Sequence, residues 1–224
     1  MRTLLNRRAA GRRLAEEIGR AGGPMVHPIV LALPRGGVPV GHEVARETGA
    51  PLDVLVVRKI GMPGNPEVGI GAVVGDAPPL FDDRAMEMFG LTEDELAADI
   101  ARERAEAHRR EVIYRRHRPE PLLAGRTVIL VDDGLATGVT ARAAVRAVRA
   151  RVPGRVVLAV PVGARQAVAD LGREADLVVC PYQPYPFRAV GQWYDHFDQV
   201  SDQEVIDVLD HQWAVHETTA GAGI

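Results

Sequence analysis

Short apolar runs alternate along the chain with segments in which apolar residues recur at helical spacing. The runs predict strands at about 28–33 (PIVLAL), 53–57, 68–74, 127–131 (TVILV), 155–161 and 176–180. The helical segments lie at about 38–47, 92–117, 139–151 and 163–171, with an amphipathic first helix that carries Leu14, Ala15 and Ile18. Strands and helices in this order predict an α/β fold with a mostly parallel sheet covered on both faces.

Two segments have the sequence of a helix start. Thr92 with Glu95, and Ser201 in the sequence SDQE, form capping boxes at the beginning of a long polar helix and of a final helix. The long helix also places Glu106–Arg110 and Glu111–Arg115 at i,i+4 spacing, which is typical of a solvated helix face.

The composition narrows the class of protein. The chain has 224 residues, of which 46% are hydrophobic and 25% charged, and its net charge of −3 does not suggest a nucleic-acid partner. Its one cysteine, Cys180, excludes an internal disulfide and favours a reducing compartment, so we expect a cytoplasmic protein. No apolar run reaches the roughly 18–20 residues that span a bilayer, so no membrane partner is expected.

The segment 128–140, VILVDDGLATGVT, carries the most specific chemistry. Four apolar residues lead into Asp132 and Asp133, and a small, flexible turn then enters a helix. Ligands of open parallel sheets bind at such strand ends, and the N–H groups at a helix N-terminus suit a phosphate. The two carboxylates could accept hydrogen bonds from the vicinal hydroxyls of a sugar attached to that phosphate.

This segment resembles the phosphoribosyl pyrophosphate (PRPP) signature of type I phosphoribosyltransferases. The resemblance implies that Asp132 and Asp133 bind the ribose hydroxyls and take part in catalysis. It also implies a 5′-phosphate loop made of Leu135, Ala136, Thr137, Gly138, Val139 and Thr140. Magnesium is implied as the cofactor; it would arrive with PRPP, with Asp132 and Asp133 as indirect ligands.

Two further segments agree with this family. Leu33-Pro34-Arg35-Gly36-Gly37 follows the first strand, where the family has its pyrophosphate loop, often with a cis non-proline peptide; here that would be Pro34–Arg35. Arg58 and Lys59 resemble the R-K-x-G string that adenine and orotate enzymes place beside the pyrophosphate. Lys59 is the only lysine among the 27 basic residues, and the resemblance makes it a catalytic candidate. The Gly/Pro-rich stretch after it stands where the family has a mobile loop.

The acceptor is less well defined. Six aromatic residues lie between Tyr182 and Phe197, in the part of the chain that forms a hood over the base in the family. The candidates for acceptor binding are Phe187, Val190, Trp193 and Asp195, in a pattern similar to 6-oxopurine enzymes but with one extra residue. Ala136, however, stands where those enzymes have an aspartate and where adenine and orotate enzymes have a small residue, so the base stays open.

The resemblance implies a core at 1–180 with a hairpin and long-helix insertion at about 61–120. A C-terminal hood and final helix would occupy 181–224. The implied reaction transfers the phosphoribosyl group from PRPP to a small nitrogenous base, purine-like in our expectation, with release of pyrophosphate in nucleotide salvage. The alternative is a noncatalytic PRPP-sensing or regulatory protein. We expect a homodimer.

Overall fold

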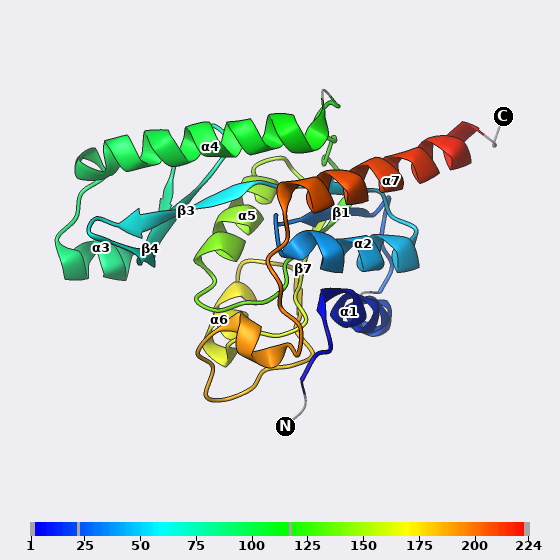
Figure 1. The fold of residues 1–224 in the computed structure, drawn as a ribbon, viewed down its shortest axis with the longest axis horizontal. Coiled ribbons are helices and arrows are strands. Elements are labelled where there is room, and N and C mark those ends of the chain that lie inside the picture. Colours follow the sequence, from blue (N-terminus) through cyan, green and yellow to red (C-terminus); the bar gives the residue numbers. More distant parts are fainter. Residues whose placement is uncertain (1–2, 22, 117, 222–224) are drawn as a thin grey trace.

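The computed structural model describes residues 3–21, 23–116 and 118–221, without the side chains of 66, 67 and 215–221. Its centre is a five-stranded parallel sheet in the order β2-β1-β6-β7-β8 (Figure 1). The strands are β1 (Ile29–Ala32), β2 (Leu52–Val54), β6 (Thr127–Val131), β7 (Arg155–Ala159) and β8 (Leu177–Val179). The predicted α/β fold with a parallel sheet is therefore confirmed.

Helices cover both faces of this sheet (Figure 1). One face packs against α1 (Arg7–Ala21), α2 (Gly37–Thr48) and α7 (Asp202–Gly221). The other packs against α5 (Val139–Arg149) and α6 (Arg165–Leu171). Side chains of a strand alternate between the faces, so Val30 joins the first core and Leu31 the second.

The register of β1 and β6 sets the position of the segments that follow them. The two strands pair in parallel with Ala32 opposite Val131, the last residue of each. Adjacent parallel strands end at the same edge of a sheet. The turn that begins at Leu33 and the turn that begins at Asp132 therefore lie side by side.

A separate arm lies between β2 and β6 in the sequence. It holds an antiparallel sheet of β3 (Val57–Met62), β4 (Asn65–Val74) and β5 (Leu80–Phe81), then α3 (Asp83–Phe89), a 3₁₀ turn at Asp94–Leu96 and α4 (Ala97–Arg115). Its own small core includes Ile60, Ile70, Leu96 and Ile100. In Figure 1 the arm projects to one side of the central sheet, and α4 runs along its top. The pattern of the sequence did not predict β5 or α3.

The strand predicted at 53–57 is wrong, because it combines two strands of different sheets. The chain leaves the parallel sheet after Val54 and enters the arm at Val57. Arg115 makes this break possible: its guanidinium donates to Val54 O at 2.8 Å and lies 3.2 Å from Asp53 Oδ1. This arginine is almost buried, so the expected Glu111–Arg115 pair on a solvated face is replaced by an internal contact.

The other local predictions for these helices are confirmed. Glu106 and Arg110 are paired at 2.7 Å. Thr92 and Glu95 form the reciprocal hydrogen bonds of a capping box, although the first turn after them is 3₁₀. Ser201 and Glu204 form the second box before α7. His117, the expected end of the long helix, lies outside the described residues.

The C-terminal part divides into two packing units. Trp193 and Tyr194 form a small aromatic cluster with Ala10 and Val162. The last helix, α7, instead packs Val205 and Leu209 into the main core.

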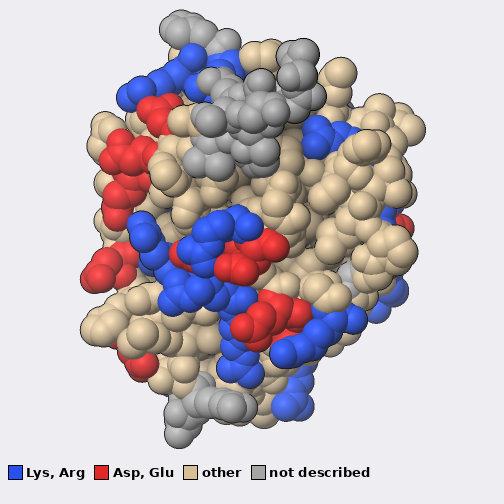
Figure 2. Space-filling model, turned by 90° about the vertical axis from the view of Figure 1, so that its right-hand side faces the viewer, with Lys and Arg blue, Asp and Glu red and all other residues tan. Residues whose placement is uncertain are grey.

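Acidic and basic side chains are interleaved on the face shown in Figure 2. Within the described residues, no helix has the length and apolar character needed to cross a membrane.

Candidate functional site

Asp132 and Asp133 lie directly after β6, at the shared edge of β1 and β6. One oxygen of each carboxylate is engaged. Asp132 Oδ1 accepts from Asp133 N at 2.8 Å, and Asp133 Oδ2 accepts from Arg7 Nε at 2.8 Å. No other described residue donates a hydrogen bond to Asp132 Oδ2 or Asp133 Oδ1. Two acceptor oxygens on neighbouring residues suit two vicinal hydroxyl groups.

Arg7, which the sequence did not single out, holds Asp133 in place. Arg7 belongs to α1. Its side chain is 12% exposed and that of Asp133 is 14% exposed. Its guanidinium also donates to Asp198 O at 2.7 Å and lies 3.8 Å from the centre of the Phe197 ring. Nothing in the local sequence distinguishes Arg7 from the other arginines of the first helix; only the tertiary contact does.

Burial governs the protonation of the two carboxyl groups. It raises the pKa of Asp132 well above its ordinary value, and the neighbouring charge of Asp133 raises it further. Burial also raises the pKa of Asp133, while the Arg7 guanidinium opposes that rise. A buried pair of acids with perturbed pKa values is typical of a functional site.

The loop Pro34–Gly37 touches the carboxylates directly. A Cβ atom on Gly36 would lie 2.0 Å from Asp133 Oδ2, and one on Gly37 would lie 2.6 Å from Val131 O. Only glycine permits this approach. The Pro34–Arg35 peptide is cis, as the resemblance led us to expect. The structure thus brings together two motifs that are about a hundred residues apart in the sequence.

Arg35 points toward α7 and α4. Its guanidinium lies 3.8 Å from Asp202 Oδ1, and the same carboxylate oxygen accepts from Tyr114 Oη at 2.5 Å. Burial and the bond to Asp202 raise the pKa of Tyr114, so its hydroxyl stays a donor. In this structure Arg35 is therefore positioned by an acid of the last helix.

The predicted phosphate loop is exposed in its middle and anchored at its ends. Ala136 and Thr137 are exposed, and Gly138, with φ of +84°, leads into α5 with Val139 as its first residue. Leu135 differs from the expectation, because it is buried and its N–H already donates to Val162 O at 2.9 Å. The N–H groups available to an anion therefore begin at Ala136. Thr140 stands in the first turn of α5 and is half-buried.

The aromatic cluster of the hood is attached to the same site. Val190 fills the space beside Gly134, where a Cβ atom would lie 2.4 Å from Val190 Cγ1. Tyr194 donates its hydroxyl to Asp133 O at 2.6 Å. Burial raises the pKa of that hydroxyl, which keeps it a donor. Sequence reasoning missed Tyr194 as well as Arg7.

The candidate acceptor residues differ in exposure. Trp193 is 4% exposed, with its ring against Tyr182 and Phe187 at centroid distances of 5.5 and 6.1 Å. This burial makes Trp193 a packing residue of the hood and does not favour it as the stacking residue. Phe187 is half-buried, and Asp195 is exposed, with its N–H donating to Leu4 O at 2.8 Å.

Arg58 and Lys59 lie on β3, in the arm. Arg58 is paired with Glu103 of α4 at 2.7 Å. Lys59 is exposed and lines a cavity of about 560 Å³ together with Asp99, Arg102 and Glu103. Asp132 and Asp133 do not line this cavity. The structure therefore does not place Lys59 with the two carboxylates in a common cavity.

The donor set at the carboxylates fits an indirectly held magnesium ion. Two neighbouring carboxylates, each with one oxygen still available, provide the hard oxygen ligands that Mg²⁺ prefers, while the rest of its shell would come from substrate and water. Among the described residues, no group of three or more His, Cys, Asp or Glu side chains could hold a metal alone.

Comparisons with known proteins agree with this geometry. Residues 3–181 match the model of the phosphoribosyl transferase domain. Two proteins of Mycobacterium tuberculosis, from strains CDC 1551 / Oshkosh and H37Rv, are each 44% identical over 223 residues and bear the provisional name phosphoribosyl transferase. The match covers 100% of this chain but 49% of each relative, so the chain spans about half their length.

A solved structure is similar over nearly the whole chain. The crystal structure of TT1426 from Thermus thermophilus is 42% identical and superimposes with a TM-score of 0.78. The superposition covers 95% of this chain and 99% of that one, so both the central sheet and the arm fall within the shared architecture.

Proposed function

This chain belongs to the phosphoribosyl transferase domain family, and we propose that it transfers the 5-phosphoribosyl group from PRPP to a small, purine-like nitrogenous base and releases pyrophosphate. One observation carries the proposal. The glycine loop Gly36–Gly37 is packed against Asp132 and Asp133. This contact supports the proposal because it joins the predicted pyrophosphate loop to the predicted ribose ligands.

The two carboxylates would orient the ribose. Asp132 Oδ2 and Asp133 Oδ1 accept hydrogen bonds from the 2′ and 3′ hydroxyls, and the N–H groups from Ala136 to Thr140 bind the 5′-phosphate. Each hydrogen bond to a charged acceptor contributes about 1.5–3 kcal/mol. Together these contacts fix the position of C1 relative to the hood.

The reaction would break the bond between C1 and the pyrophosphate oxygen as a ring nitrogen of the base attacks C1. Positive charge grows on the ribose in an oxocarbenium-like transition state, and negative charge grows on the pyrophosphate. Arg35 and the loop after it would stabilise the departing anion. Arg58 and Lys59 would join them if the arm, on which both lie, closes over the site.

Bound magnesium would neutralise part of the charge on the pyrophosphate. Asp132 and Asp133 are the residues that would hold it, through water or through the oxygens of PRPP. On the acceptor side, Phe187 would contact the face of the base, and Val190 and Asp195 would line its edge.

A second function has a specific observation in its favour. Arg7 already occupies Asp133 Oδ2, and Lys59 lies apart from the carboxylates on the arm. A protein that binds PRPP without turnover, as a sensor or regulator, would need the ribose and phosphate contacts but not Lys59.

Calorimetry with PRPP and magnesium tests the shared binding step. The double variant Asp132→Asn with Asp133→Asn keeps the shape of the site and removes both charges, so PRPP affinity should fall by at least about tenfold. Unchanged affinity in the folded variant would contradict the site. Release of pyrophosphate from PRPP, measured across a panel of bases, then separates the enzyme from the sensor.

A further inference from the structure

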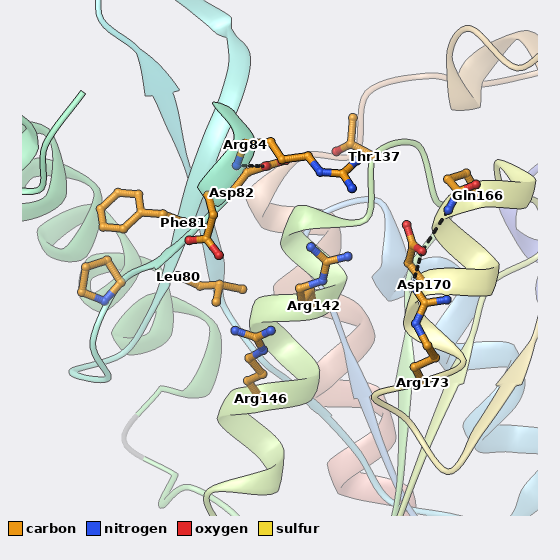
Figure 3. A pocket seen from close by; sticks show the side chains of 12 residues that line it. Leu80, Phe81, Asp82, Arg84, Thr137, Arg142, Arg146, Gln166, Asp170 and Arg173 are labelled. Atoms are coloured by element: carbon orange, nitrogen blue, oxygen red, sulfur yellow. Dashed lines mark hydrogen bonds and ion pairs between the residues drawn. The ribbon is translucent and has the colours of Figure 1, made fainter. Parts of the chain in front are cut away.

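A cavity of about 670 Å³ lies between the arm and the central domain (Figure 3). On the arm side it is bounded by β5 and the start of α3, and on the other side by α5 and α6. Four arginines from three parts of the chain line it: Arg84, Arg142, Arg146 and Arg173. Thr137 of the phosphate loop also lines it.

Two of these arginines are held in position by one carboxylate. Arg146 Nε donates to Glu174 Oε2 at 3.0 Å, and Arg142 Nε lies 2.9 Å from Glu174 Oε1. A guanidinium has five N–H donors. Glu174 accepts a hydrogen bond from Arg146 Nε, whereas Arg142 Nε is ion-paired with Glu174 without a hydrogen bond. Among the described residues, no acceptor reaches the Nη groups of either side chain. Figure 3 shows both side chains extending from α5 into the cavity.

The acidic residues of the lining are largely engaged elsewhere. Asp82 caps α3 by accepting from Arg84 N and Ala85 N. Asp170 accepts from Gln166 and Arg173 on α6 and the turn after it. Asp83 is the remaining acid of the lining. Most carboxylates of the lining therefore accept hydrogen bonds from neighbouring residues, and the guanidinium donors of Arg142 and Arg146 face the cavity.

Arg84 completes the arrangement from the arm. Its side chain runs toward Thr137 in Figure 3, so the cavity reaches the outer side of the loop. Pro79, Leu80 and Phe81 add an apolar wall beside these charges. Guanidinium groups pair well with phosphate oxygens, and a cavity of this size accommodates a nucleotide.

We propose that this cavity binds a chain of two or three phosphate groups, free or carried by a nucleotide, at a site that adjoins the predicted 5′-phosphate loop at Thr137 and shares no other residue with the predicted PRPP site. The Nη groups of Arg142 and Arg146 bind the middle of the chain, and Arg84 and Arg173 bind its two ends. In a nucleotide, the base lies against the apolar wall. The proposal does not depend on the transferase activity.

Calorimetry tests it with two probes, inorganic tripolyphosphate and ATP, in magnesium-free buffer at moderate ionic strength. Both probes should bind the wild-type chain, and the variant Arg142→Gln with Arg146→Gln should lose at least about tenfold in affinity. Equal affinities for the two probes would mean that the cavity recognises only the phosphate chain. A higher affinity for ATP would mean that its base also contacts the apolar wall. If this variant misfolds, Arg84→Gln with Arg173→Gln serves in its place, since neither side chain is buried.

The matched control is Arg20→Gln with Arg46→Gln. Each of these arginines also pairs with a carboxylate, and the change in net charge is identical. The variant Arg35→Gln distinguishes the cavity from the predicted pyrophosphate loop and should keep full affinity for the probes. The proposal is overturned if neither probe binds, if the control loses as much affinity as the cavity variant, or if Arg35→Gln abolishes binding.

Discussion

Arg7 Nε lies 2.8 Å from Asp133 Oδ2, so a residue of the first helix holds one of the two carboxylates at the end of β6. The same guanidinium packs on Phe197 and donates to Asp198 O. Arg7 thus connects the first helix, the aromatic cluster and the Asp132–Asp133 motif, and Tyr194 makes a second link to Asp133 O. The geometry of the candidate ribose site therefore depends on residues far from it in the sequence.

We expect Arg7→Gln to lower the free energy of unfolding by roughly 3–5 kcal/mol, because it leaves a nearly buried carboxylate without its partner. Denaturant unfolding measures this change. Adding Asp133→Asn should recover much of the loss, because the uncompensated charge is then absent. Strictly additive losses in the double variant would show that the ion pair is not the cause. Arg20→Gln, at an exposed pair, is the control and should have little effect.

Asp132→Asn should make the protein more stable at neutral and alkaline pH. Burial raises the pKa of Asp132, so the ionised carboxylate is less favourable in the folded state than in the unfolded state. The stability from this group is complete below the unfolded pKa, near pH 4, and is lost as pH rises through the folded-state pKa. Thermal melts of both proteins between about pH 5 and pH 8 should show a stability gain that grows with pH. A gain that stays constant over this range would contradict the assignment.

Gly36→Ala should reduce PRPP affinity by at least about tenfold. The new Cβ atom would lie 2.0 Å from Asp133 Oδ2, so either the carboxylate or the loop must move. Calorimetry with PRPP measures the effect. Gly19→Ala is the matched control, since nothing lies within 4 Å of its Cβ position in α1 and the helix tolerates alanine. Wild-type affinity in Gly36→Ala would mean that the loop does not control the site.

The two hood aromatics should respond differently to alanine. Trp193→Ala removes a buried ring and should cost about 3–5 kcal/mol of stability. Phe187→Ala, at a half-buried ring, should change stability less and weaken use of the acceptor base, since stacking on a base contributes about 1–3 kcal/mol. Melting curves and acceptor KM values separate the two effects. Normal acceptor use by Phe187→Ala would remove this residue from the acceptor site.

Lys59→Ala should lower turnover more than PRPP affinity. Lys59 would meet the pyrophosphate as charge builds on it, so its interaction strengthens in the transition state. Single-turnover rates and PRPP binding, measured on the same variant, test this split. Arg109→Ala, which removes an exposed arginine of α4 paired with Glu106, is the control for a general loss of positive charge. Equal losses in binding and turnover would make Lys59 a binding residue only.

Local patterns in the sequence determined the elements and the main motif. Apolar runs located β1, β6 and β7, and the capping boxes at Thr92 and Ser201 formed as expected. Such features depend on residues close together in the sequence, so they can be predicted without knowledge of the tertiary structure. The string VILVDDGLATGVT likewise contains a strand, two acids and a helix start, and the family that it resembles agrees with the family match over residues 3–181.

Only the tertiary structure decided which residues complete the site. The apolar run at 53–57 is continuous, so the sequence did not show that β2 ends at Val54. The carbonyl of Val54 accepts a hydrogen bond from Arg115, on a helix about sixty residues away in the sequence. Arg7, Tyr194 and the buried position of Trp193 depend on the packing of the hood against the first helix, which no local spacing encodes. Parallel strands place distant turns at one edge, so the pairing of β1 with β6 brings Gly36 next to Asp133, and the absence of a Cβ atom on Gly36 permits their contact.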